Sequence, residues 1–132
     1  MITVLDTQVW LWWLHDPRRL SAKAASAISA AEKTLDLRVS VISVWEIAVK
    51  TELGKLHLPM DISEWYRNAA GYPGLVVEAL LPVDAIASTQ LPGTFHKDPA
   101  DRIIIAVTRR HGAHLVTSDA NILAYPHVKT IW

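Results

Sequence analysis

The positions of apolar residues along the chain predict short strands that alternate with helices. Compact runs of β-branched and aliphatic residues predict buried strands, and these runs lie at residues 2–5, 37–42, 75–80, 114–118 and 128–132. Alanine-rich or amphipathic stretches predict helices at residues 7–15, 21–33, 43–53, 61–70, 83–89, 99–111 and 120–125. This alternation indicates an α/β fold, in which a parallel sheet of about five strands is flanked by helices.

Residues 99–111 are ambiguous by pattern alone, because the run Ile103–Val107 is equally typical of a strand. The flanking residues favour a helix. Asp98 suits the N-cap, Pro99 suits the first helical position and Gly112 suits the end of the helix. We therefore expect a helix whose apolar side packs on the sheet.

Other helix starts carry similar signals. Ser21 is the expected N-cap of the second helix. Ser43 with Glu46, and Asp61 with Glu64, have the spacing of a capping box, in which each side chain bonds the backbone N–H of the other residue. We expect Ser43 and Asp61 to begin their helices.

The composition is that of one globular domain, residues 1–132, with 51% apolar residues. Thirteen basic residues balance thirteen acidic ones, so net charge gives no reason to expect broad binding of nucleic acid. The absence of cysteine excludes disulfides and thiolate metal sites. The N-terminus lacks the marks of a signal peptide, and the apolar runs are shorter than the ~20 residues of a membrane helix. A cytoplasmic location without a membrane partner is the default expectation.

Four acidic residues are expected to meet at one edge of the sheet. Asp6 follows the first strand and Asp119 follows the fourth. Glu46 and Asp101 lie in the first turns of helices that begin at the same edge, and Asp98 is expected there as well. In open α/β folds, ligands bind at this carboxyl edge of the strands.

Some of these acids also have a purely structural interpretation. Glu46 fits a capping box, Asp98 fits an N-cap and Asp101 fits the positive end of a helix dipole. Asp6 and Asp119 end strands, where an acid is expected to bring no local benefit. A functional role is therefore favoured for these two.

Like charges that converge raise one another's pKa values unless a cation joins them. The nearby Lys50 and Arg102 are too few to neutralise the group. Carboxylate oxygens are ligands of hard ions, so the cluster predicts a Mg²⁺ or Mn²⁺ site. No histidine occupies these four positions, which argues against zinc.

Four segments together resemble the PIN-domain ribonucleases, in particular the VapC-like toxins of bacterial toxin–antitoxin pairs. They are LDTQVWLWWL near the start, SVWEIAVKTELGKLHLP (43–59), FHKDPADRIIIAV (95–107) and HLVTSD (114–119). The resemblance covers essentially the whole chain, in order. It implies a PIN-like fold and a metal-dependent endoribonuclease, which inhibits translation and growth by hydrolysing RNA and is itself inhibited by a cognate antitoxin.

The resemblance also implies roles for the acids. Asp6 and Asp119 are metal ligands, directly or through water, Asp101 completes the cluster, and Glu46 orients water or binds a second ion. The implied cleavage by water leaves 3′-hydroxyl and 5′-phosphate ends. The chain departs from many relatives at Ala100, where they carry a bulky aromatic residue, and this affects packing beside the site and not the ligands.

Hydroxyl side chains flank the acids. Thr7, Thr117 and Ser118 either support the metal ligands or are ordinary capping and strand-end residues. Asp98 is interpreted mainly as the N-cap, and the resemblance does not settle whether it also supports the site.

Four basic residues lie near the acids in the sequence: Lys50, His96, Lys97 and Arg102. Each either contacts a phosphate of the RNA substrate or is an ordinary solvated residue. The sequence does not decide between these two roles.

The tryptophan-rich helix 7–15 is the expected partner surface. Trp10, Trp13 and Leu14 repeat at helical spacing and predict core or interface positions, whereas Trp12 lies off that stripe. Because the net charge is zero, tight binding of an antitoxin needs apolar contacts, which this helix offers. We expect the antitoxin tail to lie over the acids, and we also expect a homodimer.

Two other classes of function stay open. A metal-dependent phosphatase or a phospho-accepting signalling domain uses a similar sheet, but the chain has no Asp-x-Asp at the first strand and no acid is expected to end the third. A catalytically inactive interaction module would not need a complete set of acids.

Overall fold

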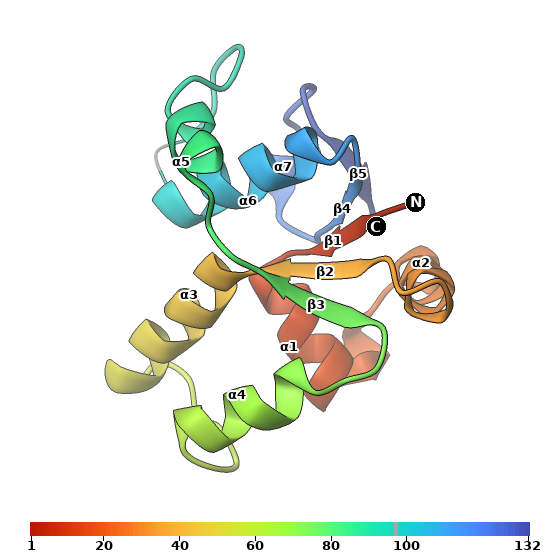
Figure 1. Cartoon of the computed structure of the whole chain (residues 1–132), viewed down its shortest axis with the longest axis vertical. Coiled ribbons are helices and arrows are strands. Elements are labelled where there is room, and N and C mark those ends of the chain that lie inside the picture. The colour runs from red at the N-terminus through yellow and green to blue at the C-terminus, as the bar shows by residue number, and fades with distance from the viewer. Residues whose placement is uncertain (97) are drawn as a thin grey trace.

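A parallel five-stranded sheet forms the centre of the molecule (Figure 1). The computed structural model describes residues 1–96 and 98–132. The strand order is β3-β2-β1-β4-β5, and every neighbouring pair is parallel. The strands are β1 (Thr3–Leu5), β2 (Leu37–Ser40), β3 (Leu75–Glu78), β4 (His114–Val116) and β5 (Lys129–Ile131). The predicted parallel α/β sheet is confirmed.

Helices cover both faces of this sheet. In Figure 1, α1, α3 and α4 lie on one side of it, and α5, α6 and α7 lie on the other. The helices are α1 (Thr7–His15), α2 (Ala22–Lys33), α3 (Val41–Glu52), α4 (Ile62–Ala70), α5 (Pro82–Ser88), α6 (Pro99–Arg110) and α7 (Ala120–Leu123), with a 3-10 helix η1 (Pro17–Arg19) that the pattern did not predict. Within residues 1–96 and 98–132, no helix has the length and apolar character needed to cross a membrane.

Two apolar clusters join the helices to the sheet, because successive side chains of a strand point to opposite faces. Leu5 and Val116 lie in the cluster with α1 to α4, whereas Val4 and Leu115 lie in the cluster with α6 and α7. Leu5 pairs with Val116 in the sheet register. The segments that follow β1 and β4 therefore start side by side at one edge.

The apolar stripe of α1 belongs to the larger cluster. Trp10 is fully buried, with its ring centroid 5.1 Å from that of Trp65. Trp13 and Leu14 are partly buried and pack against the same cluster. The predicted core positions are confirmed, and Trp12 is half-buried off the stripe.

Three predicted N-caps are confirmed. The side chains of Ser21, Asp61 and Asp98 each accept a hydrogen bond from the backbone N–H three residues later, at 3.1, 3.0 and 3.1 Å. Pro99 occupies the start of α6, and Gly112 follows its end with φ +59°. The run Ile103–Val107 is therefore helical, as its flanking residues predicted.

The predicted start of α3 was wrong. Strand β2 ends at Ser40, whose side chain accepts from the backbone N–H of Ile42 and caps the helix. Ser43 lies inside α3 and is fully buried. The capping box of Ser43 with Glu46 is therefore absent, and both side chains are available to the site described below.

Asp6 and Asp119 do have a local structural role, contrary to expectation. Asp6 is the N-cap of α1 and accepts from the backbone N–H of Thr7 at 2.8 Å. Asp119 is the N-cap of α7 and accepts from the backbone N–H groups of Asn121 and Ile122 at 2.8 and 3.1 Å. Asp6 immediately precedes α1 and Asp119 immediately precedes α7, so each acid is also a capping residue.

An acid also ends the third strand, which the sequence interpretation excluded. Glu78 closes β3, and its carboxylate lies 2.7 Å from His111, 3.1 Å from Arg110 and 3.5 Å from Arg38. Arg110 also forms a two-pronged ion pair with the buried Asp84, at 2.7 and 3.0 Å. This network joins α5 and α6 to the sheet, so Glu78 serves packing there.

Candidate active site

All the acids predicted for the site lie around one hollow at the carboxyl edge of the sheet. Asp6 follows β1, Asp119 follows β4 by three residues, Glu46 projects from α3, and Asp98 and Asp101 lie at the start of α6. The hollow measures about 300 Å³ and is lined by these five acids with Thr7, Gln8, Lys50 and Ser118. Residues up to 113 positions apart in the sequence thus share one site, as expected.

Asp6 is the most enclosed of these acids, with 8% of its surface exposed. One of its carboxylate oxygens accepts from the backbone N–H of Thr7, and the other accepts from the Thr117 hydroxyl at 2.7 Å. The Thr117 hydroxyl in turn accepts from the backbone N–H of Asp119 at 3.1 Å. Thr117 therefore links the acids that follow the two central strands and fixes the orientation of Asp6.

Glu46 is held by a second chain of hydroxyl groups. The Thr7 hydroxyl donates to Glu46 Oε1 and lies 2.8 Å from the Ser43 hydroxyl. Since an ionised carboxylate can only accept, the Thr7 proton points to Glu46, and Ser43 donates to Thr7. Ser43 thus supports the site from inside α3. The sequence interpretation missed this role because it placed Ser43 at the start of the helix, as its capping residue.

Burial and mutual repulsion raise the pKa values of three acids. The pKa of Asp101 rises from 3.8 to about 8, first because the group is buried and then because the other four acids repel its charge. Burial is also the first cause that raises the pKa values of Asp6 and Glu46, while hydroxyl hydrogen bonds and the Lys50 ammonium group oppose it. In the part of the chain that the structure describes, five acids line the hollow together with one basic residue, Lys50.

His96 lies beside this cluster, although no histidine was expected there as a ligand. Its Nε2 atom is 3.2 Å from Asp101 Oδ2. Lys50 lines the hollow, as its place in the sequence suggested. Lys97 was also a possible phosphate contact, but it lies outside the described residues.

The guanidinium of Arg102 bonds to backbone carbonyls, so it is not available to contact a phosphate. Its guanidinium donates to the backbone carbonyls of Ser88, Phe95 and His96, at 2.8, 3.2 and 3.3 Å. It therefore holds the segment before α6 against the end of α5. The helix start that carries Asp101 is fixed by this arginine.

The donor atoms suit a hard divalent cation. Carboxylate and hydroxyl oxygens line the hollow, and the repulsion that raises the pKa of Asp101 is what a bound cation would relieve. In the part of the chain that the structure describes, no three acidic or histidine side chains already stand close enough together to ligate one ion. The acids are instead held by hydroxyl and backbone N–H groups, so a cation would bind partly through water or after small side-chain rotations.

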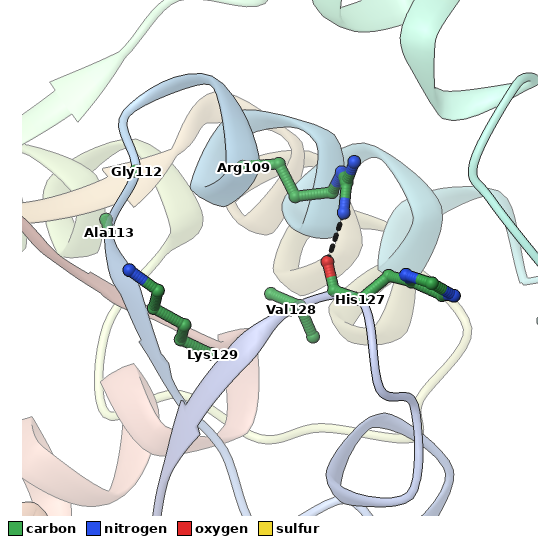
Figure 2. A pocket seen from close by; sticks show the side chains of 6 residues that line it. All are labelled: Arg109, Gly112, Ala113, His127, Val128 and Lys129. Carbon is green, nitrogen blue, oxygen red and sulfur yellow. Dashed lines mark hydrogen bonds between the residues drawn. The ribbon is translucent and has the colours of Figure 1, made fainter.

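A second hollow lies at the opposite edge of the sheet and has different chemistry. Figure 2 shows the guanidinium of Arg109 turned toward the backbone carbonyl of His127, to which it donates a hydrogen bond. Lys129 starts β5 beside His114, the first residue of β4, so this is the amino edge of the strands. The hollow measures about 230 Å³, and no acid is among the residues that line it. A hard divalent cation would find no carboxylate ligand among these described residues.

Comparison with known proteins identifies the family. The family described as PIN domain matches residues 3–128. The chain belongs to the PIN-domain family. Ribonuclease VapC22 from Mycobacterium tuberculosis is 36% identical over 135 aligned residues, which cover 100% of both chains. The predicted likeness to VapC-like members is confirmed, and nucleases of this family generally depend on a divalent metal ion.

Solved structures of PIN-domain proteins share the fold. VapBC2 from Rickettsia felis, bound to a promoter DNA fragment, matches with a TM-score of 0.71 and 14% identity, over 98% of this chain and 97% of the other. The DNA-bound VapBC of Salmonella typhimurium matches with a TM-score of 0.68 and 16% identity, over 98% and 96%. At such identities the likeness concerns the fold alone.

Proposed function

We propose that this PIN-domain chain is a metal-dependent endoribonuclease and the toxin of a toxin–antitoxin pair. The observation that carries the proposal is the meeting of Asp6, Glu46, Asp101 and Asp119 at one hollow. The relative from M. tuberculosis, which matches over its whole length, is a ribonuclease, and this supports the same class of substrate. By hydrolysing RNA phosphodiesters, the toxin inhibits translation and growth. A cytoplasmic location stays a prediction.

The chain's own residues set up the chemistry. Asp6, Asp101 and Asp119 would hold Mg²⁺ or Mn²⁺, and Glu46 would orient water or hold a second ion. When bound, the cation lowers the pKa of a water molecule and neutralises charge on the phosphodiester. Thr117 keeps Asp6 in place, as its hydroxyl donates to the carboxylate at 2.7 Å.

Thr7 orients Glu46, and Lys50 is placed to bind the substrate. The Thr7 hydroxyl occupies Glu46 Oε1, which leaves the other carboxylate oxygen to accept from the attacking water. Lys50 lines the same hollow and offers its ammonium group to an RNA phosphate. Hydrolysis by this route leaves 3′-hydroxyl and 5′-phosphate ends.

One assay separates this function from the two alternatives. Purified protein is given single-stranded RNA and, separately, p-nitrophenyl phosphate, each with Mg²⁺, with Mn²⁺ and with EDTA. Cleavage of RNA that EDTA stops is the expected result. Hydrolysis of the phenyl phosphate without RNA cleavage would favour a phosphatase, and no turnover of either compound would favour an inactive module.

We further propose that the antitoxin occupies an apolar groove beside α1. The groove measures about 470 Å³, and its lining includes Trp12, Leu11, Leu56 and Leu58. Gln8 lines both this groove and the acidic hollow, so the two are neighbours on the surface. An apolar peptide in the groove can therefore extend a basic side chain to the acids, where a guanidinium pairs with carboxylates.

We also propose that the chain forms a homodimer. Apolar side chains are exposed on α5 and on the edge strand β3, where Val83, Ile86 and Val76 are 55%, 59% and 46% exposed. Such a surface favours association of two copies. Light scattering on the purified chain should give twice the mass of one chain.

A further inference from the structure

We propose that a hollow between residues 94–96 and the end of α7 binds a nucleobase of the RNA, next to the phosphate that is cut. The proposal rests on the ribonuclease function above and adds a specificity site to it. The hollow measures about 370 Å³, within the roughly 300–1,000 Å³ of small-molecule sites. Its lining is Thr94, Phe95, His96, Asn121, Ala124, Tyr125 and Pro126.

Aromatic side chains form the wall of this hollow. The ring centroid of Phe95 lies 4.2 Å from that of His96 and 4.9 Å from that of Tyr125. Tyr125 is buried in the cluster beneath α6, and its hydroxyl donates to the carbonyl of Pro92. Phe95 packs against the same cluster. Phe95 and Tyr125 are thus fixed before any ligand arrives, and the half-buried rings of Phe95 and His96 are the ones that can stack on a base.

The polar groups of the hollow are suited to a neutral, planar ligand. Among the residues that line it within 1–96 and 98–132, none is an aspartate, glutamate, lysine or arginine. Asn121 is exposed and carries an amide that both donates and accepts, which matches the edge of a base. Of the described lining side chains, only that of His96 can carry a positive charge, and its Nε2 atom already lies 3.2 Å from Asp101 Oδ2. The chemistry therefore favours a nucleobase over a phosphate group.

Two residues of the hollow also touch the catalytic acids. His96 Nε2 lies 3.2 Å from Asp101 Oδ2, and the backbone N–H of Asn121 donates to the Asp119 carboxylate at 2.8 Å. These two contacts make the hollow a neighbour of the acidic site, although the two have no described lining residue in common. A base in the hollow belongs to a nucleotide adjacent to the phosphate held at the acids.

The test combines altered RNA with altered protein. A single-stranded RNA that the wild type cuts is prepared with one abasic nucleotide at each position around the cut. The variants are Asn121→Ala, which removes the amide, and Ala124→Leu, which reduces the space. Asn68→Ala and Ala30→Leu make the same changes on α4 and α2, outside the lining of the hollow. Melting temperatures verify that each variant is folded.

In the wild type, an abasic nucleotide at one position beside the cut should lower kcat/KM about tenfold, as expected for the loss of one stacked base. Asn121→Ala and Ala124→Leu should show a similar loss on the intact RNA and little further loss on that abasic RNA. Both controls should behave like the wild type. Equal sensitivity to the abasic position in folded pocket variants and wild type would overturn the proposal.

Failure of the ribonuclease function would look different. In that case the wild type cuts no RNA. The proposed base site is then tested by measuring the binding of the same RNAs with fluorescence anisotropy. Tighter binding of intact than of abasic RNA, lost in Asn121→Ala, would still support the base site. Equal binding of every RNA by both proteins would reject it.

Discussion

At the scale of single residues, Asp101 should contribute most to the pH dependence of the free energy of unfolding. Its pKa lies at about 8 in the folded chain, against an ordinary value of 3.8, because the group is buried and repelled by the other acids. Between these values the folded protein keeps a proton that the unfolded chain has released. The free energy of unfolding of the metal-free protein therefore falls as pH rises through this window.

We expect the melting temperature in EDTA to decrease from about pH 5 to about pH 8. Added Mg²⁺ should restore more stability at the higher pH, since binding displaces the proton from Asp101. Asp101→Asn should flatten the decrease, and differential scanning fluorimetry would measure all three effects. A decrease of the same size in Asp101→Asn would assign the effect to other groups.

Asp6→Asn should abolish RNA cleavage and weaken Mn²⁺ binding while the fold stays intact. Burial raises the pKa of Asp6, so its charge costs stability when no cation is bound, and the amide should raise the melting temperature in EDTA. Calorimetric titration with Mn²⁺ and a cleavage assay would measure both effects. Glu64→Gln, a charge removal at an exposed position on α4, is the control. Full activity in Asp6→Asn would contradict the assignment of the metal site.

Asp98→Ala and Asp101→Ala should differ in kind, although the two acids are three residues apart. Asp98 caps α6 at 3.1 Å, and loss of an N-cap costs about 0.5–2 kcal/mol of stability. Asp101→Ala should remove activity with little loss of stability, because it removes a repelled charge and a ligand together. Urea unfolding and RNA cleavage on both variants separate the effects. An inactive but fully stable Asp98→Ala would show that Asp98 serves the metal.

At the scale of elements, α6 was predicted correctly because the capping residues at both of its ends indicated a helix, although its apolar run is equally typical of a strand. The sequence interpretation placed the N-cap of α3 three residues late, at Ser43 and not at Ser40, since Val41 and Ile42 are β-branched and extend the pattern of β2. Ser40 carried the correct capping signal. The convergence of the acids was predictable, because parallel strands put their carboxyl ends at one edge.

Contacts between segments that are distant in the sequence could not be predicted from the sequence alone. The approach of His96 to Asp101 depends on how Arg102 holds three backbone carbonyls. The role of Ser43 depends on α1 and α3 packing side by side, so that its hydroxyl meets Thr7. Such contacts are set by tertiary packing, which no local pattern records.

The link between α5 and α6 rests on a buried charge. Asp84 is 1% exposed, and Arg110 forms a two-pronged pair with it. Arg110→Ala would leave this carboxylate buried without its partner, so we expect a loss of about 3 kcal/mol in the free energy of unfolding, measured in urea. Arg109→Ala, beside it on α6, removes an exposed side chain bonded to one carbonyl and should cost less than about 1 kcal/mol. Equal losses in the two variants would exclude a special role for the buried pair.

At the scale of the whole molecule, the surfaces proposed for catalysis and for antitoxin binding are neighbours with different chemistry. The acidic hollow is polar and short of positive charge, whereas the groove beside α1 is lined mainly by apolar side chains. Gln8 lines both, so one bound segment can reach from the groove to the acids. With thirteen charges of each sign, the chain offers little long-range attraction, and affinity must come from contact.

Trp12 is the side chain whose loss should separate the two functions. It is half-buried on α1, its ring lies 5.8 Å from that of Trp132 and 5.9 Å from the Arg19 guanidinium, and it lines the groove. Trp12→Ala should weaken antitoxin binding about tenfold or more, as expected for a buried aromatic contact, and leave cleavage by the free protein unchanged. Trp45→Ala is the matched control, because Trp45 is 57% exposed on α3 and lines neither hollow. Where a small protein is encoded beside this chain, it is co-expressed and purified as the antitoxin for the binding titration, and cleavage is measured on the separated chain. Unchanged affinity in Trp12→Ala and in further substitutions along α1 would place the antitoxin elsewhere, and would leave the acidic site as the centre of RNA hydrolysis.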